Sequence, residues 1–407
     1  MTTLLMVFMV LTGCERKPLY LSVGDNVNIE VAVYDIRLEL LWGINWEANW
    51  HYDWNTHLYG DMGYTAPEWV RATIYTSDSV GSFRKDPQVR NFDAKGGRVT
   101  LKPGGWYDML FYSAGTEYVL YSYDEDNSYY NATTRTSSGV GNYTRNEVDE
   151  NGDTIGTYVQ MNQPDELFGT FLDELRVSED PDDYEKTIDE DDNIVYLYKI
   201  DATMNPYSFI YLYQLLILNN EDSIGNKIVG GRGLTVTGLS RGTNLFSRMT
   251  FDNVISLSSE DIKPMINDVN LKLEDGTETH ADVMACRMLT WGLPGINPLE
   301  EVSYYSHTRV DANGEFERRQ YVSPLDSNYV GVALTLRNGN TLNIARNITT
   351  EMNNHPAGGI ITIIVDASTI PEKALDPNYG GGGSTSGGGF NAKVEDWANT
   401  EEAEITI

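Results

Sequence analysis

Apolar and polar residues alternate with a period of two in many short segments of this chain, and this pattern constrains the fold most. The alternation is clear in Val27–Tyr34, Ala72–Tyr75 and Arg98–Leu101. A period of two is the spacing of side chains that share one face of a β-strand. Asn-Gly or Asp-Gly pairs, which favour tight hairpin turns, recur at residues 151–152, 275–276, 313–314 and 338–339. Because convincing helical patterns are scarce, the sequence predicts an all-β protein built from antiparallel β-sandwiches.

The length of 407 residues exceeds what one hydrophobic core usually serves, so two domains are expected. A boundary is predicted near residue 195, because Glu179–Asp192 holds nine acidic residues and one lysine and is interpreted as an exposed loop. Tyr196–Ile200 and Ser208–Leu218 follow, and we interpret these strongly apolar segments as central strands at the seam. The predicted domains are residues 19–195 and 196–370.

The first thirteen residues contain no charged side chain and are almost entirely apolar. This segment is too short to cross a bilayer as a helix, which needs about 20 residues. It fits the apolar region of a secretory signal, and Leu11–Cys14 matches the lipobox at which bacterial lipoproteins are cleaved and acylated. The alternative is a buried apolar N-terminus that ends in an ordinary cysteine. We therefore predict a signal peptide over residues 1–13 and lipidation of Cys14. The second cysteine, Cys286, is interpreted as a small buried hydrophobic residue.

The net charge of −31, from 60 acidic and 29 basic residues, limits the classes of partner. Nucleic acid and anionic lipid surfaces are not expected as partners, because binding to either needs clustered Lys and Arg. Strong like charge also keeps an exported protein soluble, which is the simplest interpretation of this composition. Asp189–Asp192 would attract calcium, but the segment lacks the spacing of an EF-hand loop, so we interpret it as a solvated charge run.

The sequence contains none of several common catalytic motifs. The five histidines form no HExxH pair, and no GxSxG elbow, phosphate-binding loop or dinucleotide fingerprint occurs. A glycosidase with two distant carboxylates stays open, but abundant acidic residues do not indicate one. We therefore expect a protein that is not an enzyme and that needs no cofactor or metal.

Four tryptophans, Trp42, Trp46, Trp50 and Trp54, recur at a spacing of four residues. In an extended segment this spacing places all four indoles on one side. An exposed row of this kind is typical of a platform that stacks on sugar rings and binds a glycan. The alternative is that some of these indoles pack into the first sandwich while others brace a loop, since aromatic side chains gain much from burial.

The C-terminal segment, residues 371–407, carries a glycine-rich stretch with seven glycines and three hydroxyl residues at 380–389. Such a stretch behaves as a flexible coil with a span of about 18 Å. Apolar residues are spaced along the peptide that follows, which makes it a candidate partner strand that docks on this molecule or on a neighbour; they are Phe390, Val394, Trp397, Ile405 and Ile407. The alternative is a frayed terminus without a partner.

Several short motifs, most clearly those at the two ends, resemble the fimbrillin-like lipoproteins of Bacteroidales, and most closely the branch catalogued as a domain of unknown function. The end motifs are Cys14–Tyr20 and Gly387–Phe390 with Val394, Trp397 and Ile405, and the internal ones are Leu101–Gly104, Gln163–Phe168 and Gly233–Leu239.

This resemblance implies two tandem transthyretin-like β-sandwich domains and a lipid anchor in the outer membrane, at the cell surface. It also implies fimbrial subunits as partners and assembly by strand exchange. Shaft subunits of the family lose their first strand by cleavage after an arginine, but Arg16 lies too close to Cys14 for that role. We therefore expect an anchor or accessory subunit, with a surface glycan-binding lipoprotein as the alternative.

The lipid anchor is testable by metabolic labelling with a palmitate analogue. We expect Cys14→Ser to abolish labelling, because Cys14 is the residue that the lipobox places for acylation. Cys286→Ala, the matched control at the second cysteine, should label like the native protein. Unchanged labelling of Cys14→Ser would contradict the anchor.

Overall fold

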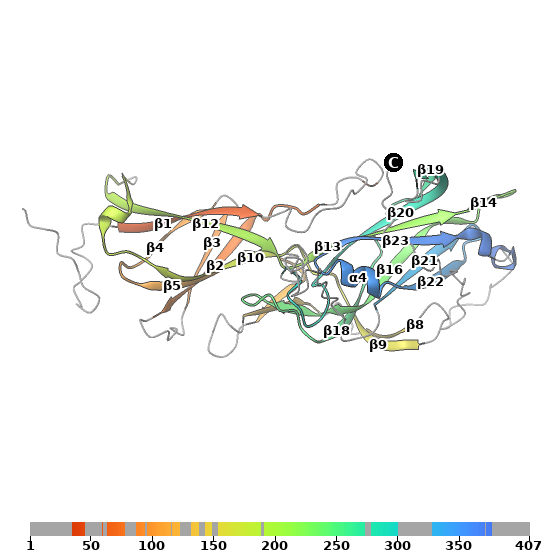
Figure 1. Ribbon diagram of the computed structural model, residues 1–407, viewed down its shortest axis with the longest axis horizontal. Coiled ribbons are helices and arrows are strands. Elements are labelled where there is room, and N and C mark those ends of the chain that lie inside the picture. Colours follow the sequence, from red (N-terminus) through yellow and green to blue (C-terminus); the bar gives the residue numbers. More distant parts are fainter. Residues whose placement is uncertain are drawn as a thin grey trace, which may run out of the picture.

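The computed structural model of the protein describes residues 35–44, 59, 63–77, 87–93, 96–114, 116–122, 132–137, 143–148, 154–188, 191–272, 278–299, 328–370 and 372–376. Strands dominate these residues, and they form two β-sandwich lobes that lie end to end (Figure 1). The all-β class predicted from the sequence is confirmed.

Two layers of strands form the N-terminal lobe. One layer has the order β3 (Gln88–Asp93), β2 (Trp69–Ser77), β5 (Trp106–Ala114) and β10 (Phe168–Arg176). The other contains β11 (Glu185–Ile188), β12 (Ile194–Pro206), β1 (Asp35–Ile44) and β4 (Gly97–Thr100). Side chains of β5 alternate between the faces, so that Met109 and Phe111 join the core between the layers while Leu110 and Tyr112 face away from it.

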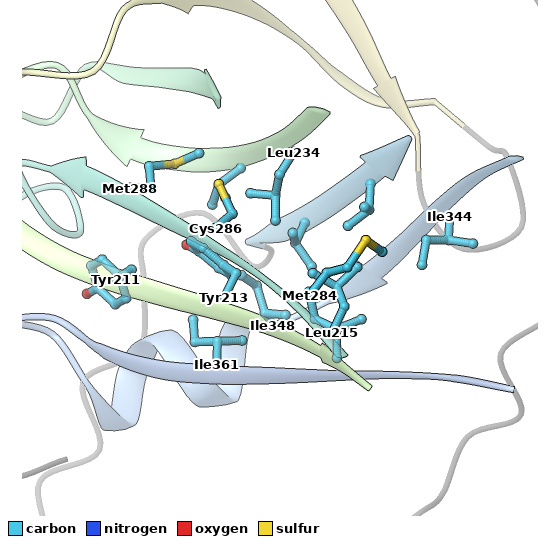
Figure 2. Packing of buried hydrophobic residues seen from close by; sticks show 14 of the residues in the cluster. Tyr211, Tyr213, Leu215, Leu234, Met284, Cys286, Met288, Ile344, Ile348 and Ile361 are labelled. Atoms are coloured by element: carbon cyan, nitrogen blue, oxygen red, sulfur yellow. The ribbon is translucent and has the colours of Figure 1, made fainter. Parts of the chain in front are cut away.

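The C-terminal lobe is a second sandwich. One layer has the order β19 (Ile266–Lys272), β20 (Glu278–Thr290), β13 (Phe209–Leu218) and β23 (Gly359–Asp366). The other has the order β22 (Thr341–Asn347), β21 (Tyr329–Leu336), β16 (Ile228–Ser240), β18 (Val254–Ser259), β9 (Thr154–Met161) and β8 (Tyr143–Val148). Figure 2 shows side chains from both layers filling the space between them, among them Tyr213, Cys286 and Leu234.

Smaller elements complete the described chain. They are η3 (Pro181–Asp183), β14 (Glu221–Asp222), β15 (Gly225–Asn226), α4 (Thr349–Asn354), η4 (Ala367–Thr369) and η5 (Glu372–Leu375). Helix α4 buries Met352 in the core of the C-terminal lobe. Cys286 is fully buried there as the sequence predicts, and burial raises the pKa of its thiol to about 11.

A small sheet and an aromatic cluster join the two lobes. Strands β6 (Val119–Ser122), β7 (Thr133–Thr136) and β17 (Gly242–Asn244) form this sheet from segments that are far apart in sequence. Trp291 is fully buried beside it, and its indole Nε1 donates a hydrogen bond to Oγ1 of Thr136 at 2.7 Å. Phe171 and Phe246 meet edge to face with centroids 4.7 Å apart. Buried contacts of this kind hold the lobes together.

Several expected elements occur where the sequence places them. Ala72–Tyr75 lies in β2, Val330–Leu336 in β21, and Gly359–Asp366 is β23. Residues 338–339 turn the hairpin between β21 and β22, with Gly339 at φ 84°. Val27–Tyr34 lies outside the described residues.

Two features differ from the expectations. The sandwiches contain parallel neighbours, β1 with β12 and β13 with β23, beside the antiparallel pairs. The acidic run Glu179–Asp192, expected as a loop, contains η3 and the short strand β11, because backbone pairing with β12 satisfies the amides of β11 while the side chains of Asp182, Asp183 and Glu185 stay exposed. The domain limits 19–195 and 196–370 stay a prediction.

The joint between the lobes makes a clear prediction about Gly242. A Cβ atom at this position would overlap the carbonyl oxygen of Thr134 and lie 2.9 Å from Cα of Arg135. We expect Gly242→Ala to lower the free energy of unfolding by about 1 to 3 kcal/mol, measured by thermal and urea denaturation. Gly230→Ala is the matched control, because a Cβ there meets nothing within 4 Å. Equal stability of the two variants would contradict the tight joint.

Candidate functional site

Strand β10 leaves its neighbour β12 after two residues. The two strands pair only at Phe168 with Pro206 and at Gly169 with Asn205. The rest of β12 pairs with β1 and, near its start, with β11, while the other edge of β10 pairs with β5. Among the described residues, the edge of β10 from Thr170 to Arg176 therefore has no strand beside it. A strand edge without a neighbour offers backbone N–H and C=O groups to an added strand.

A groove of about 330 Å³ lies along this edge. Leu172 and Leu175 of β10 form one wall, and Tyr198 and Ile200 of β12 form the other. Both leucines are half-buried and pack against the core of the N-terminal lobe, whereas the Tyr198 side chain is 43 % exposed. The groove therefore leads from solvent to the apolar interior between the two layers.

A β-bulge shapes the outer part of the β10 edge. The register with β5 shifts between Leu172 and Leu175, and Glu174 adopts a positive φ of 52°. The carboxylate of Asp108 on β5 fixes this bulge, because its Oδ1 accepts a hydrogen bond from the backbone N–H of Glu174 at 2.8 Å. Burial is the main cause that raises the pKa of Asp108, and the nearby charges of Asp173 and Glu174 raise it further.

The β12 wall is held by aromatic and charged neighbours. Tyr184 meets Tyr198 edge to face at 5.9 Å, and its hydroxyl donates to the carbonyl oxygen of Ser178 at 3.0 Å. Lys199 lies 3.3 Å from the carboxylate of Glu185 on β11. This ion pair is exposed on both sides and adds little stability, so the aromatic contact is the firmer support of the wall.

Most of the sequence-predicted site residues lie outside the described residues. These are Cys14, Trp46, Trp50, Trp54, Phe390, Val394, Trp397, Ile405 and Ile407. The backbone of Trp42 is described and pairs with Ala202 in β12. Among the described residues, no group of three or more His, Cys, Asp or Glu side chains is arranged to hold a metal ion.

The β10 edge was not identified from the sequence. The motif Gln163–Phe168 leads into β10, but nothing in its residue types shows that the strand then separates from β12. One local signal is present, since the acidic pair Asp173–Glu174 interrupts the apolar positions Phe171, Leu172 and Leu175. Such an interruption is typical of a bulge at a sheet edge.

Comparison with protein families identifies the family of the chain. The family described as "Domain of unknown function (DUF5119)" matches residues 49–256, just over half of the chain. The protein therefore belongs to this family, and the predicted relation to a branch catalogued as a domain of unknown function is confirmed. A comparison with curated proteins finds no match.

Solved structures similar to this chain come from species of Bacteroides and Porphyromonas. A candidate adhesin from Bacteroides ovatus is 12 % identical, with 85 % of this chain and 98 % of that chain covered and a TM-score of 0.41. A candidate adhesin from Bacteroides thetaiotaomicron is 9 % identical, with 82 % of this chain and 92 % of that chain covered and a TM-score of 0.40. The fimbrial anchor protein Mfa2 from Porphyromonas gingivalis is 12 % identical, with 81 % of this chain and 90 % of that chain covered and a TM-score of 0.34.

Membrane crossing by a helix finds no support in the part of the chain that the structure describes. No helix there combines the length and the apolar character that a bilayer span requires.

The contact between Asp108 and Glu174 makes a prediction about pH. Asp108→Asn keeps an oxygen that accepts from Glu174 N–H and removes a buried negative charge, so we expect unchanged or higher stability at pH 7. Because the folded-state pKa of Asp108 is raised, the native protein loses stability as pH rises through that pKa and regains it on acidification. The difference between variant and native protein, measured by urea unfolding, should shrink as pH falls.

Asp108→Ala is the control that removes the hydrogen-bond acceptor together with the charge. It should be less stable than Asp108→Asn at every pH, since the amide of Glu174 loses its partner. An Asp108→Asn variant that is less stable than the native protein at pH 7 would contradict the account of this site.

Proposed function

We propose that this protein is a lipid-anchored cell-surface protein that acts as an anchor or accessory subunit of fimbriae and binds its partner by strand addition. The observation that carries the proposal is that, among the described residues, no strand pairs with the edge of β10 beside the groove. In strand addition, main-chain hydrogen bonds provide affinity, and pockets for alternate side chains provide specificity. Attachment to the outer membrane through Cys14 is the second part of the proposal and rests on the lipobox at Leu11–Cys14.

The groove suits an incoming strand better than the edge of β3, the outer strand of the same sheet, does. Outer strand β3 also pairs on one side, but its side chains are almost all exposed, and Val89 on it is 47 % exposed. At β10, by contrast, alternate side chains of an added strand would contact Leu172 and Leu175 and lose apolar surface to water. Burial of this surface adds affinity that a fully solvated edge does not offer.

The end of the described chain lies far from the β10 groove, which favours docking of the C-terminal peptide on a neighbouring molecule. Strands β13 and β23 run in parallel away from the joint of the lobes, so η5 lies at the far end of the C-terminal lobe (Figure 1). The path from η5 back to the groove runs along eight residues of β23 and eight of β12. At about 3.3 Å per strand residue, this path is about 50 Å long. By the square-root rule for glycine-rich sequences, the fourteen residues that follow Asp376, up to Phe390, are expected to span about 20 Å. We therefore propose that the peptide Phe390–Ile407 docks on a neighbouring molecule rather than in its own groove.

Glycan binding by the tryptophan row stays the alternative function. It rests on the spacing of Trp42, Trp46, Trp50 and Trp54 in the sequence.

Site-specific photocrosslinking in living cells tests strand addition. A benzoylphenylalanine at Asp173 would sit on the exposed β10 edge, and the same residue at Val89 on β3 is the matched control. Both positions are exposed, so neither change should disturb folding. We expect a covalent product with a fimbrial subunit from Asp173 and little from Val89. No product from Asp173 in cells that assemble fimbriae, or equal products from both positions, would contradict the proposal.

A further inference from the structure

A second hollow, of about 240 Å³, lies near the joint of the lobes and away from the β10 groove. The segment Thr65–Trp69 forms one side. The other side is formed by Ser113 near the end of β5, by Thr116 after it, by Asp165 and Glu166 before β10 and by Phe168 at the start of β10. It shares no lining residue with the groove. We call it the Trp69 pocket.

The Thr65–Trp69 side of this pocket is fixed in place. Glu166 Oε2 accepts a hydrogen bond from the backbone N–H of Thr65 at 2.6 Å, and Glu166 Oε1 forms an ion pair with Arg287 of the C-terminal lobe. Next to it, the hydroxyl of Tyr64 donates to the carbonyl oxygen of Ser208 at 3.0 Å, and its ring meets Phe168 at 5.2 Å. The pocket is therefore formed before any ligand arrives, which lowers the entropy that binding would cost.

An exposed indole lines the pocket. Trp69 is 51 % exposed, although it stands next to the fully buried Val70 in β2. Two other tryptophans differ from Trp69 in this respect. Trp291 is buried, and the guanidinium of Arg176 lies over the ring of Trp106, 5.7 Å from its centroid. A half-exposed aromatic face beside a hollow gains free energy when an apolar ligand face covers it.

Polar groups around the indole point to a ligand rich in hydroxyls. Asp165 Oδ2 accepts the backbone N–H of Tyr118 at 2.5 Å, which orients the carboxylate and leaves further lone pairs for ligand hydroxyls. Glu68 is an exposed carboxylate at the rim, and Glu166 is neutralised by Arg287. The side chains of Thr65 and Thr116 add hydroxyls, which both donate and accept.

We propose that the Trp69 pocket binds one sugar residue of a glycan. A pyranose has an apolar C–H face for the indole and hydroxyl groups that donate to Asp165 and Glu68 and accept from threonine. The volume is below the roughly 300 to 1,000 Å³ of pockets for larger ligands, so it suits a single ring at the end of a glycan. This site differs from the predicted row at Trp42–Trp54, and it is independent of strand addition at β10.

Calorimetry on the full-length protein, with methyl glycosides of glucose, galactose and mannose and with N-acetylglucosamine, tests this proposal. We expect saturable binding of at least one of these sugars. Trp69→Ala should weaken it by at least about tenfold, whereas Trp69→Phe, which keeps an aromatic face, should retain most of it. Asp165→Asn keeps an acceptor for Tyr118 N–H and should weaken binding without changing the melting temperature. Val89→Ala on the neighbouring strand β3 is the control that should bind normally.

Three results would overturn the proposal. They are no binding of any of these sugars to the native protein, sugar binding that is unchanged in Trp69→Ala, and saturable binding of arginine amide alone that disappears at high salt. The last would mark a site for a basic side chain, because ion pairing at an exposed pocket is screened by salt. None of these results bears on crosslinking at Asp173, so the two proposals succeed or fail separately.

Discussion

The parallel pairing of β12 with β1 is the interaction on which the rest of the N-terminal lobe depends. Ten residue pairs, from Asp35 with Val195 to Ile44 with Met204, hold β12 in one layer of the sandwich. Only its last two residues pair with β10 in the other layer. The layers are therefore joined at one end and separate at the other, and the groove beside Leu172 and Leu175 lies where they separate. If β12 paired along β10 instead, the edge proposed to accept a strand would be covered.

The joint between the lobes has a different role, because it fixes the segments that carry the Trp69 pocket. Arg287 from the C-terminal lobe pairs with Glu166 in the segment before β10, and Glu166 in turn holds the backbone of Thr65. The edge-to-face contact of Phe171 with Phe246 and the hydrogen bond from Trp291 to Thr136 lie in the same region. A chain with one lobe alone would lack these contacts. The proposed sugar pocket therefore depends on both lobes, whereas the β10 groove depends on the first.

The sequence predicts the local parts of this structure well, because period-two alternation and turn chemistry act over a few residues. Strand β23 and the hairpin at Asn338–Gly339 follow directly from them. Strand partners were not predictable in the same way, since the pattern that makes β12 a strand is the same whether it pairs with β1 or with β10. The Trp69 pocket shows the same limit: Trp69 and Asp165 are 96 positions apart, and only the fold brings them to one hollow. The tryptophans at 42–54 were prominent because they are close in sequence.

Amide hydrogen exchange along β10 measures the central claim most directly. Exchange rates would be compared between the protein in envelopes from cells that assemble fimbriae and the same protein purified away from its partners. The account predicts that the amides of Thr170–Arg176 that face the groove exchange more slowly in the assembled state, because an added strand accepts their hydrogen bonds. Equal exchange of these amides in both states, with slower exchange at another strand edge such as β3, would contradict it.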